Sequence, residues 1–221
     1  MEKGIIRLFF RIKNQNNCNF VAESRFMKRV VNIHTHHPTG LAIEPTAAGI
    51  HPWNAATQSI SEIEPLISEA DAIGEIGLDA ACNVDIKIQT ALFRRQLSLA
   101  EKFDKPVILH CVRTFELVMK ILEEYHLRAV IFHGFIGSPE QAKRAIAKGY
   151  FLSFGERTFR SPKSIEALRS TPLEQLFLEN DNSPIPIEKI YEQIAGLLKI
   201  STNKLIEAIW ENYAKIFLAD N

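Results

Sequence analysis

The segment PVILHCVRTFELVMKILEEYHLRAVIFH, residues 106–133, decides the fold that the sequence predicts. It contains two short apolar runs, 106–110 and 129–133, and each run ends in a histidine. Between them, residues 115–125 form an amphipathic stretch of helical length. A strand, a helix and a second strand in this order are typical of a parallel sheet that is covered by helices.

The same alternation continues along the chain from residue 27. The other strand candidates are 29–33, 46–50, 71–78, 150–154 and 176–180, so the sequence predicts about seven strands. Helices are predicted over 59–70, 88–103, 138–149, 186–198 and 202–217, with Ser138 and Ser201 as capping residues and Gly149 as a stop. Without an internal repeat or a linker, this pattern favours an α/β fold of the TIM-type (β/α) barrel over two domains.

The composition is typical of one globular domain. The chain has 221 residues, of which 46% are hydrophobic, and it carries 26 basic and 26 acidic side chains. This balance excludes an overall basic field of the kind that binds duplex nucleic acid without sequence preference. Three cysteines without C-x-x-C spacing argue against a disulfide framework and against a cysteine-based zinc site.

The sequence also predicts where the protein resides and where its domain begins. No apolar run approaches the ~20 residues that a membrane-spanning helix needs, so we expect a cytoplasmic protein that does not bind membranes. No protein partner can be inferred. Residues 1–26 show no steady period and are predicted to be a leader, or alternatively an extra strand or helix, before a single barrel domain over 27–221.

Histidines and carboxylates are expected at or just past the ends of the predicted strands. They are His34, His36, Glu75, His110, His133 and Asp181. The carboxyl ends of the strands in a parallel barrel open onto one face, so we expect these six side chains to meet there. In an extended segment His34 and His36 lie on the same side, because alternate side chains share a face.

Imidazole and carboxylate groups together are suited to zinc, manganese or iron, and magnesium is favoured where carboxylates and water dominate. Six ligands exceed what one tetrahedral ion needs, so the sequence predicts two divalent metal ions. Each residue alone has a simpler interpretation. A single histidine at a strand end is often structural, Glu75 could pair with an arginine, and Asp181 could cap a helix.

Several motifs, taken together, resemble the TatD-type metal-dependent deoxyribonucleases, which belong to the amidohydrolase-like TIM barrels. The resemblance covers nearly all of the chain after Met27. The motifs are HTHH (34–37), GIHPW (49–53), AIGEIGLD (72–79), KPVILHCVR (105–113), HGFIGS (133–138), YFLSFG (150–155), END (179–181) and ENYAKIF (211–217). The order of GEIGLD, the later histidines and the late aspartate makes this combination specific.

The resemblance implies metal-dependent hydrolysis, commonly of DNA phosphodiester bonds from an end. One ion would be held by His34 and His36 together with Glu75 and Asp181. Glu75 would bridge to a second ion, whose other ligands are His110 and His133. Asp181 is the candidate general base.

Two further residues are candidates for substrate binding. Arg113 matches an arginine of the family pattern and could clamp a phosphate with two hydrogen bonds, unless it forms a surface salt bridge. His51 of GIHPW could contact the substrate or could order its loop. Trp53 could stack on a base or could form part of an apolar lid.

The chain departs from the family pattern at two places. Residues 37–48 are too few for the helix and strand that family members have between H-x-H and G-x-H-P, so we expect a barrel reduced by one strand and one helix. After Asp181 the family's E-T-D-S-P becomes END followed by Asn182, Ser183 and Pro184. The extra residue predicts a reshaped loop after the aspartate.

Three functions are consistent with these residues. The first is a two-metal phosphodiesterase that acts on DNA or on a small phosphoester. The second is hydrolysis of an amide, an ester or a lactone, because an activated hydroxide also attacks carbonyl carbon. The third is metal binding without catalysis. Basic side chains such as Arg113 and Arg157 near the metal ligands would favour a phosphate substrate.

Overall fold

The computed structural model describes residues 29–219, and its centre is a parallel sheet of five strands. The strands lie in chain order across the sheet, and every neighbouring pair is parallel. They are β1 (Ile73–Asp79), β2 (Val107–Val112), β3 (Val130–Phe132), β4 (Phe151–Phe154) and β5 (Leu176–Leu178). Most of their side chains are buried, as is usual for a parallel sheet covered by helices, although the second half of β2 is only half-buried. The predicted α/β fold with a parallel sheet is confirmed.

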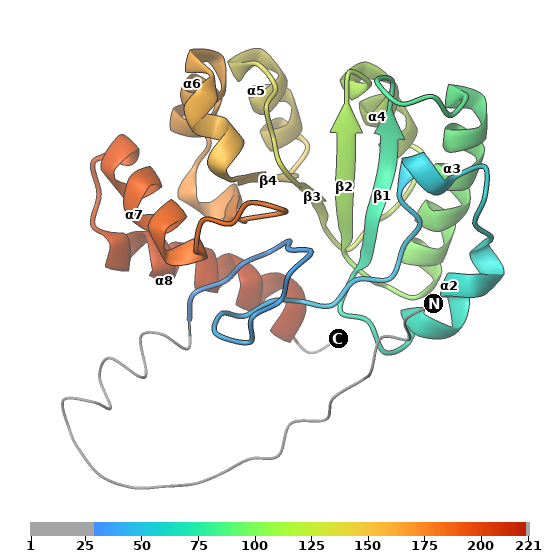
Figure 1. The fold of residues 1–221 in the computed structure, drawn as a ribbon, viewed down its shortest axis with the longest axis horizontal. Coiled ribbons are helices and arrows are strands. Elements are labelled where there is room, and N and C mark those ends of the chain that lie inside the picture. Colours follow the sequence, from blue (N-terminus) through green and yellow to red (C-terminus); the bar gives the residue numbers. More distant parts are fainter. Residues whose placement is uncertain (1–28, 220–221) are drawn as a thin grey trace, which may run out of the picture.

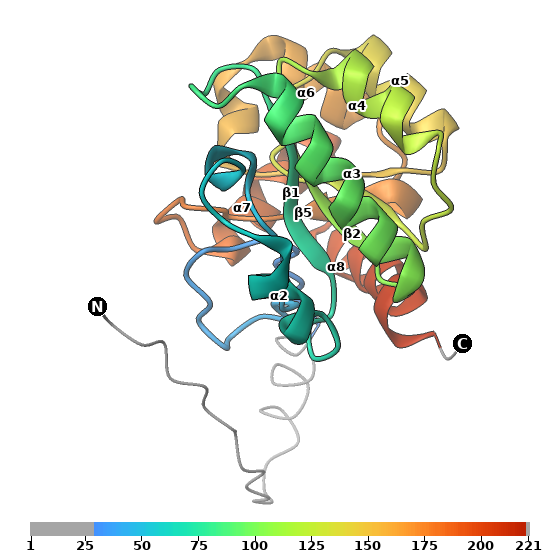
Figure 2. The same cartoon turned by 90° about the vertical axis from the view of Figure 1, so that its right-hand side faces the viewer.

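Helices surround the sheet and connect its strands (Figure 1). They are α2 (Ile60–Ile67), α3 (Ile86–Lys102), α4 (Phe115–Leu122), α5 (Pro139–Ala147), α6 (Pro162–Ser170), α7 (Ile187–Leu198) and α8 (Thr202–Tyr213). Short helical turns lie at η1 (Pro52–Asn54), η2 (Glu156–Arg160), η3 (Leu173–Gln175) and η4 (Ala214–Leu218). Figure 2 shows α2 and α3 on the outer side of β1.

The predicted helix boundaries agree with the capping residues. Ser138 begins α5 and accepts a hydrogen bond from the backbone N–H of Gln141, and Ser201 begins α8 in the same way. Gly149 has a φ of +79° and follows Lys148, the C-cap residue of α5, which is the position and conformation that stop a helix. Helix α6 was not predicted, although its capping residue Ser161 is followed by a proline, as Ser138 is.

The first two predicted strands do not form ladders. The segments 29–33 and 46–50 are extended but make only the isolated parallel bridges Val31 to Ile43 and Ala47 to Ala72. Hydrogen bonds still attach them to the sheet, from the N–H of Ile33 to the carbonyl of Leu178 (3.0 Å) and from the N–H of Ala48 to the carbonyl of Ala72 (3.1 Å). The structure therefore has five strands where seven were predicted. The other two predicted strands, 29–33 and 46–50, are extended segments attached to the sheet.

The short connection between these two segments explains why they do not pair as strands. Residues 37–48 contain only bends and isolated bridges, so neither a helix nor a strand occupies this interval, as its length predicts. Pro38 and Pro45 lack a backbone N–H and cannot donate to a ladder. In Figure 1 this blue segment lies between β1 and the loops after β5.

One large hydrophobic core unites these elements and contains buried residues from Val30 to Ile216. Gly77 of β1 has a φ of +142° and lies against the backbone of β2, where a Cβ atom would be 1.9 Å from the carbonyl oxygen of His110.

None of the helices within 29–219 has the length and apolar character needed to cross a bilayer. The predicted leader over 1–26 lies outside the described residues.

Candidate metal centre

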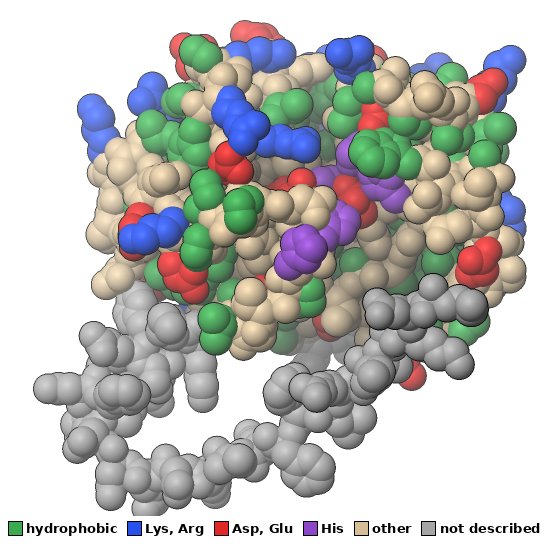
Figure 3. Space-filling view, in the orientation of Figure 1, with side chains coloured by type: hydrophobic (Ala, Val, Ile, Leu, Met, Phe, Trp, Pro, Cys, Tyr) green, Lys and Arg blue, Asp and Glu red, His purple; other side chains and the backbone are tan. Residues whose placement is uncertain are grey.

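Seven ionisable side chains converge on one face of the molecule, and Figure 3 shows the histidines gathered in a hollow beside acidic groups. The six predicted metal ligands and His51 are all among them. The expectation that the predicted ligands stand at or past strand ends is wrong for two of them. Glu75 lies inside β1 and His110 inside β2, because both strands extend past the position of the ligand.

Glu75 occupies the centre of the cluster and divides its two oxygens between two sets of histidines. Its Oε1 lies 3.9 Å from Nε2 of His34 and 3.8 Å from Nε2 of His36. Its Oε2 lies 3.0 Å from Nδ1 of His110 and also contacts Nε2 of His133. A carboxylate placed in this way can bridge two cations, one on each side.

Asp181 completes the side of the cluster that contains the H-x-H pair. Its Oδ1 lies 3.3 Å from Nε2 of His36 and 3.8 Å from Nε2 of His34. Its backbone N–H donates to the carbonyl of His34, and its own carbonyl accepts from the N–H of His36. The extra residue Asn182 therefore leaves Asp181 in register with the H-x-H segment.

The donor atoms fit divalent metal ions. Nε2 of His34 is buried and has no hydrogen-bond partner among the described residues, and an unpaired buried nitrogen is costly unless a ligand satisfies it. Three groups of three side chains bring their donor atoms within 4.8 Å of one another. Imidazole nitrogens and carboxylate oxygens at such spacing are the ligands that zinc and manganese take.

The charges in the centre are strongly coupled. Burial by itself raises the pKa of Glu75, but hydrogen bonds from His110 and His133 hold it below its ordinary range. Burial lowers the pKa of His34. Burial also opposes the charged form of His133, but the carboxylates of Glu179 and Glu75 raise its pKa to about 10. A cation bound by this histidine requires its neutral form, so metal binding and protonation compete at His133.

Two carboxylates that were not predicted as site residues contact the nitrogens of His110 and His133 that face away from Glu75. Asp79 places Oδ2 at 3.2 Å from Nε2 of His110, and Glu179 places Oε1 at 3.2 Å from Nδ1 of His133. Both residues belong to the quoted motifs GEIGLD and END. The signal that could have found them is an acidic residue within an apolar strand, because such a residue is seldom buried without a partner.

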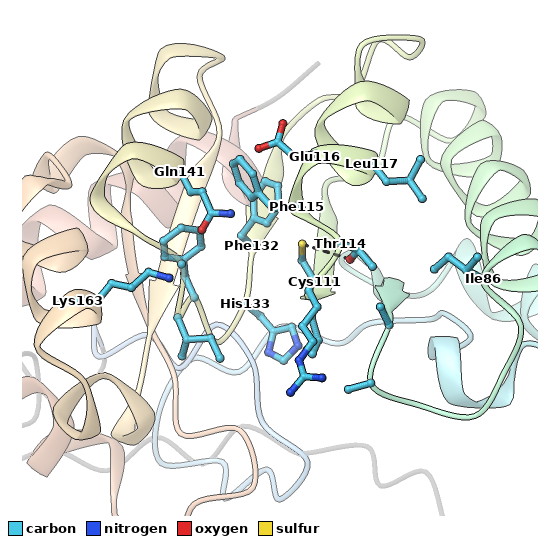
Figure 4. A pocket seen from close by; sticks show the side chains of 17 residues that line it. Ile86, Cys111, Thr114, Phe115, Glu116, Leu117, Phe132, His133, Gln141 and Lys163 are labelled. Atoms are coloured by element: carbon cyan, nitrogen blue, oxygen red, sulfur yellow. Dashed lines mark hydrogen bonds between the residues drawn. The ribbon is translucent and has the colours of Figure 1, made fainter.

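The predicted substrate-binding residues lie beside this cluster. Arg113 has a φ of +57° and lines a cavity of about 770 Å³ together with His133 and Lys163. Figure 4 shows His133 at one end of this cavity and Lys163 extending into it from α6. Arg113 forms no ion pair with any residue in 29–219, so the alternative of a surface salt bridge is not observed there.

The cavities on the two sides of the centre differ in charge. Arg157 and Asp181 line a second cavity of about 300 Å³, which also includes Asn182. A third cavity, of about 520 Å³, is lined by His34, His36, His51 and Glu75, and the described residues around it include no lysine or arginine. Among these three cavities of the described residues, the two on the side of His133 and Asp181 have basic side chains in their lining.

His51 and Trp53 lie together at the edge of the centre. Nε2 of His51 is 3.7 Å from Oε1 of Glu75. The indole of Trp53 packs edge-on against the His51 ring at a centroid distance of 4.9 Å and donates a hydrogen bond to Oδ2 of Asp79 (2.7 Å). Trp53 is 60% exposed, so its indole is anchored by its nitrogen while part of it remains open to solvent.

Comparison with known proteins relates the chain to one family. The family model described as "TatD related DNase" matches residues 13–218. The chain is 31% identical over 194 residues to the uncharacterized metal-dependent hydrolase YabD of Bacillus subtilis, covering 77% of the chain and 76% of that protein. It is 30% identical over 162 residues to human deoxyribonuclease TATDN3, covering 66% and 59%.

Structural comparison agrees with the sequence. The crystal structure of the TatD homologue YjjV from Escherichia coli superposes with a TM-score of 0.71 at 27% identity, covering 82% of this chain and 79% of that one. The chain is 36% identical over 163 residues to a TATDN1 homologue of Encephalitozoon cuniculi, covering 72% of this chain but only 57% of that protein's length. The α/β fold with its parallel five-stranded sheet is thus that of a TatD-type structure, which is consistent with the predicted reduced barrel.

Proposed function

The chain belongs to the TatD-related DNase family, and from this membership we propose that it is a metal-dependent hydrolase of phosphodiester bonds in DNA, acting from an end. One observation carries the proposal. Oε1 of Glu75 faces His34 and His36, with His51 beside them, and Oε2 faces His110 and His133, directly beside a cavity lined by Arg113 and Lys163.

The site residues are proposed to act as the sequence predicts. His34, His36, His110, His133, Glu75 and Asp181 would hold two divalent ions, for which magnesium, manganese and zinc are the candidates. When bound, such ions supply an activated water and neutralise charge on a phosphoryl oxygen. Asp181 keeps 21% of its side chain exposed, so it can accept a proton from that water and pass it to solvent.

The cationic cavity supports phosphate as the group that binds beside the metals. Arg113 has no partner among the described residues, so its guanidinium is available to donate two parallel hydrogen bonds to one phosphate. Lys163 adds a second positive charge to the same cavity. A carbonyl substrate would need no such cations.

We also propose a reducing compartment such as the cytoplasm, in keeping with the free thiols of Cys82 and Cys111.

Hydrolysis assays test this proposal. Metal-stripped protein is resupplied with magnesium, manganese or zinc and is assayed on single-stranded DNA and on bis(p-nitrophenyl) phosphate. We expect metal-dependent cleavage that is lost in Glu75→Ala and in Asp181→Ala. Glu166→Ala, which removes an exposed carboxylate of α6, should retain full activity.

Two results would contradict the proposal. Cleavage that survives in Glu75→Ala would place the reaction elsewhere. A protein that binds metal but cleaves neither substrate would instead require amide and lactone substrates to be tested.

A further inference from the structure

Three of the five imidazole rings around Glu75 have one nitrogen toward Glu75 and the other toward a second protein group. His110 turns its outer nitrogen, Nε2, to the carboxylate of Asp79. His133 turns its outer nitrogen, Nδ1, to the carboxylate of Glu179. His51 differs, because its outer nitrogen, Nδ1, accepts a hydrogen bond from the backbone N–H of Trp53 at 3.2 Å.

His110 and His133 have a carboxylate on both sides of the ring, because Glu75 faces the inner nitrogen. With their inner nitrogens as the proposed metal ligands, the single proton of each neutral ring lies on the outer nitrogen, where Asp79 or Glu179 accepts its hydrogen bond. The inner nitrogen of the neutral ring then has a free lone pair, as a metal ligand must. A backbone N–H only donates. The neutral ring that faces it carries its proton on the opposite nitrogen.

This rule separates His51 from the metal ligands. As metal ligands, His110 and His133 would present lone pairs to the centre through Nδ1 and Nε2 respectively. His51 presents an N–H through Nε2, although this atom is close enough to Glu75 and His110 for the three to form a candidate metal group. We infer that His51 is a hydrogen-bond donor to an oxygen of the substrate and not the ligand of a further metal ion.

The surroundings of His51 hold it in this orientation. Its ring packs edge-to-face against His110 at a centroid distance of 4.4 Å and against Trp53 on another side. The loop that supplies the Trp53 N–H is anchored by the hydrogen bond from the indole to Asp79. His51 also lines the cavity of about 520 Å³ that adjoins His34 and His36, so its Nε2 can face a molecule bound there.

The target of this donor rests on the proposed function. In a phosphodiester held beside Glu75, the Nε2–H of His51 would point to a non-bridging phosphoryl oxygen, where negative charge increases as the bond breaks. A donor that is already oriented stabilises such charge without reorganisation. Arg113 and Lys163 lie in a different cavity, so their contact to the substrate would be separate.

The experiment compares His51→Gln and His51→Ala with His110→Ala. Metal content is measured by mass spectrometry after equilibration with manganese, and kcat and KM are measured on bis(p-nitrophenyl) phosphate. We expect both His51 variants to bind as much metal as the unchanged protein, whereas His110→Ala loses metal. We expect kcat of His51→Ala to fall about 100-fold, the usual effect of removing one such donor. His51→Gln should recover part of the loss, because its amide also donates.

Nitrogen NMR of the imidazole rings provides a measurement that does not depend on activity. The His51 signal, identified by its absence in His51→Gln, should show a proton on Nε2 and none on Nδ1.

Each contrary result overturns a definite part of the inference. Metal loss in His51→Ala, or a proton on Nδ1, would make His51 a ligand. Unchanged kcat in His51→Ala would show that it donates nothing to the substrate. If the unchanged protein cleaves no phosphodiester with any metal, the proposed function and the substrate contact fail together, and metal content and NMR still decide whether His51 is a ligand.

Discussion

At the scale of single residues, Asp79 shows how one side chain orients several others. Its Oδ2 accepts from the indole of Trp53 and faces Nε2 of His110, while its Oδ1 accepts from the backbone N–H of Ala81 at 2.7 Å. Both oxygens are therefore used as acceptors, and these hydrogen bonds lower the pKa of Asp79 against the effect of burial.

We expect Asp79→Asn to weaken metal binding about 10- to 100-fold, as is usual when the outer partner of a ligating histidine is changed. An asparagine has one carbonyl oxygen, so its NH₂ group would face at least one N–H donor in place of an acceptor. Calorimetric titration of metal-stripped protein measures the affinity.

Asp85→Asn is the matched control, because asparagine caps a helix as well as aspartate does and Asp85 begins α3. It should leave metal affinity unchanged. Equal affinities of the two variants would show that Asp79 does not tune the centre.

At the scale of the secondary-structure elements, helix α7 fastens the extended segment that holds the H-x-H pair. The buried hydroxyl of Tyr191 donates to the carbonyl of Val31 at 2.9 Å and accepts from its N–H at 3.3 Å. These bonds replace part of the ladder that the segment lacks. His34 follows three residues later, so its position depends on this attachment.

We expect Tyr191→Phe to lower the free energy of unfolding by about 1–3 kcal/mol, because the buried N–H and C=O of Val31 would lose this partner. Urea unfolding at fixed metal concentration measures the change. Tyr150→Phe serves as the control, since the hydroxyl of this half-buried tyrosine has no hydrogen bond within the described residues. A loss no larger than that of the control would argue against the attachment.

The close approach of β1 and β2 depends on a glycine. We expect Gly77→Ala to destabilise the fold by more than about 3 kcal/mol, because a Cβ there would overlap the backbone of His110 and the φ of +142° is strained for alanine. Thermal unfolding and circular dichroism measure the loss.

Gly149→Ala measures the cost of a positive φ at an alanine without a steric overlap of its Cβ. This glycine also has a positive φ, but a Cβ would meet nothing within 4 Å. Its cost should be only about 1–2 kcal/mol. If Gly77→Ala and Gly149→Ala lower stability by similar amounts, the contact between Gly77 and the backbone of β2 adds nothing to the cost.

The elements themselves were predictable to different degrees. Strands β1 to β5 and six of the helices follow from apolar periodicity, because each signal lies within a short stretch of chain. Helix α6 was missed, although residues 161–170 begin with the same Ser-Pro capping pattern as α5. The segments 29–33 and 46–50 have the composition of strands, but their pairing depends on the length of the connection between them.

At the scale of the whole molecule, the centre joins segments from both ends of the domain. The ligands come from residues 34 to 181, and the carboxylates between them would repel one another without cations or protons. Metal binding should therefore stabilise the entire fold.

We expect metal at 100 times its Kd to raise Tm by about 5–11 °C relative to metal-stripped protein, which corresponds to about 2.7 kcal/mol of binding linkage for a chain of this size. Differential scanning calorimetry with and without manganese measures the shift. Glu75→Ala should lose most of it. An equal shift in that variant would mean that the ions stabilise the protein at another place.

The sequence by itself determined the alternation of strands and helices, the family, and which six side chains could meet, because periodicity and strand position are encoded locally. Only the tertiary structure decided how these side chains are oriented. Asp79 and Glu179 reach His110 and His133 across 31 and 46 positions of chain. The hydrogen bond from the Trp53 backbone to His51 depends on how one turn is folded. Such contacts favour one tautomer of each ring, and neither composition nor spacing encodes a contact between distant residues or the exact conformation of a turn.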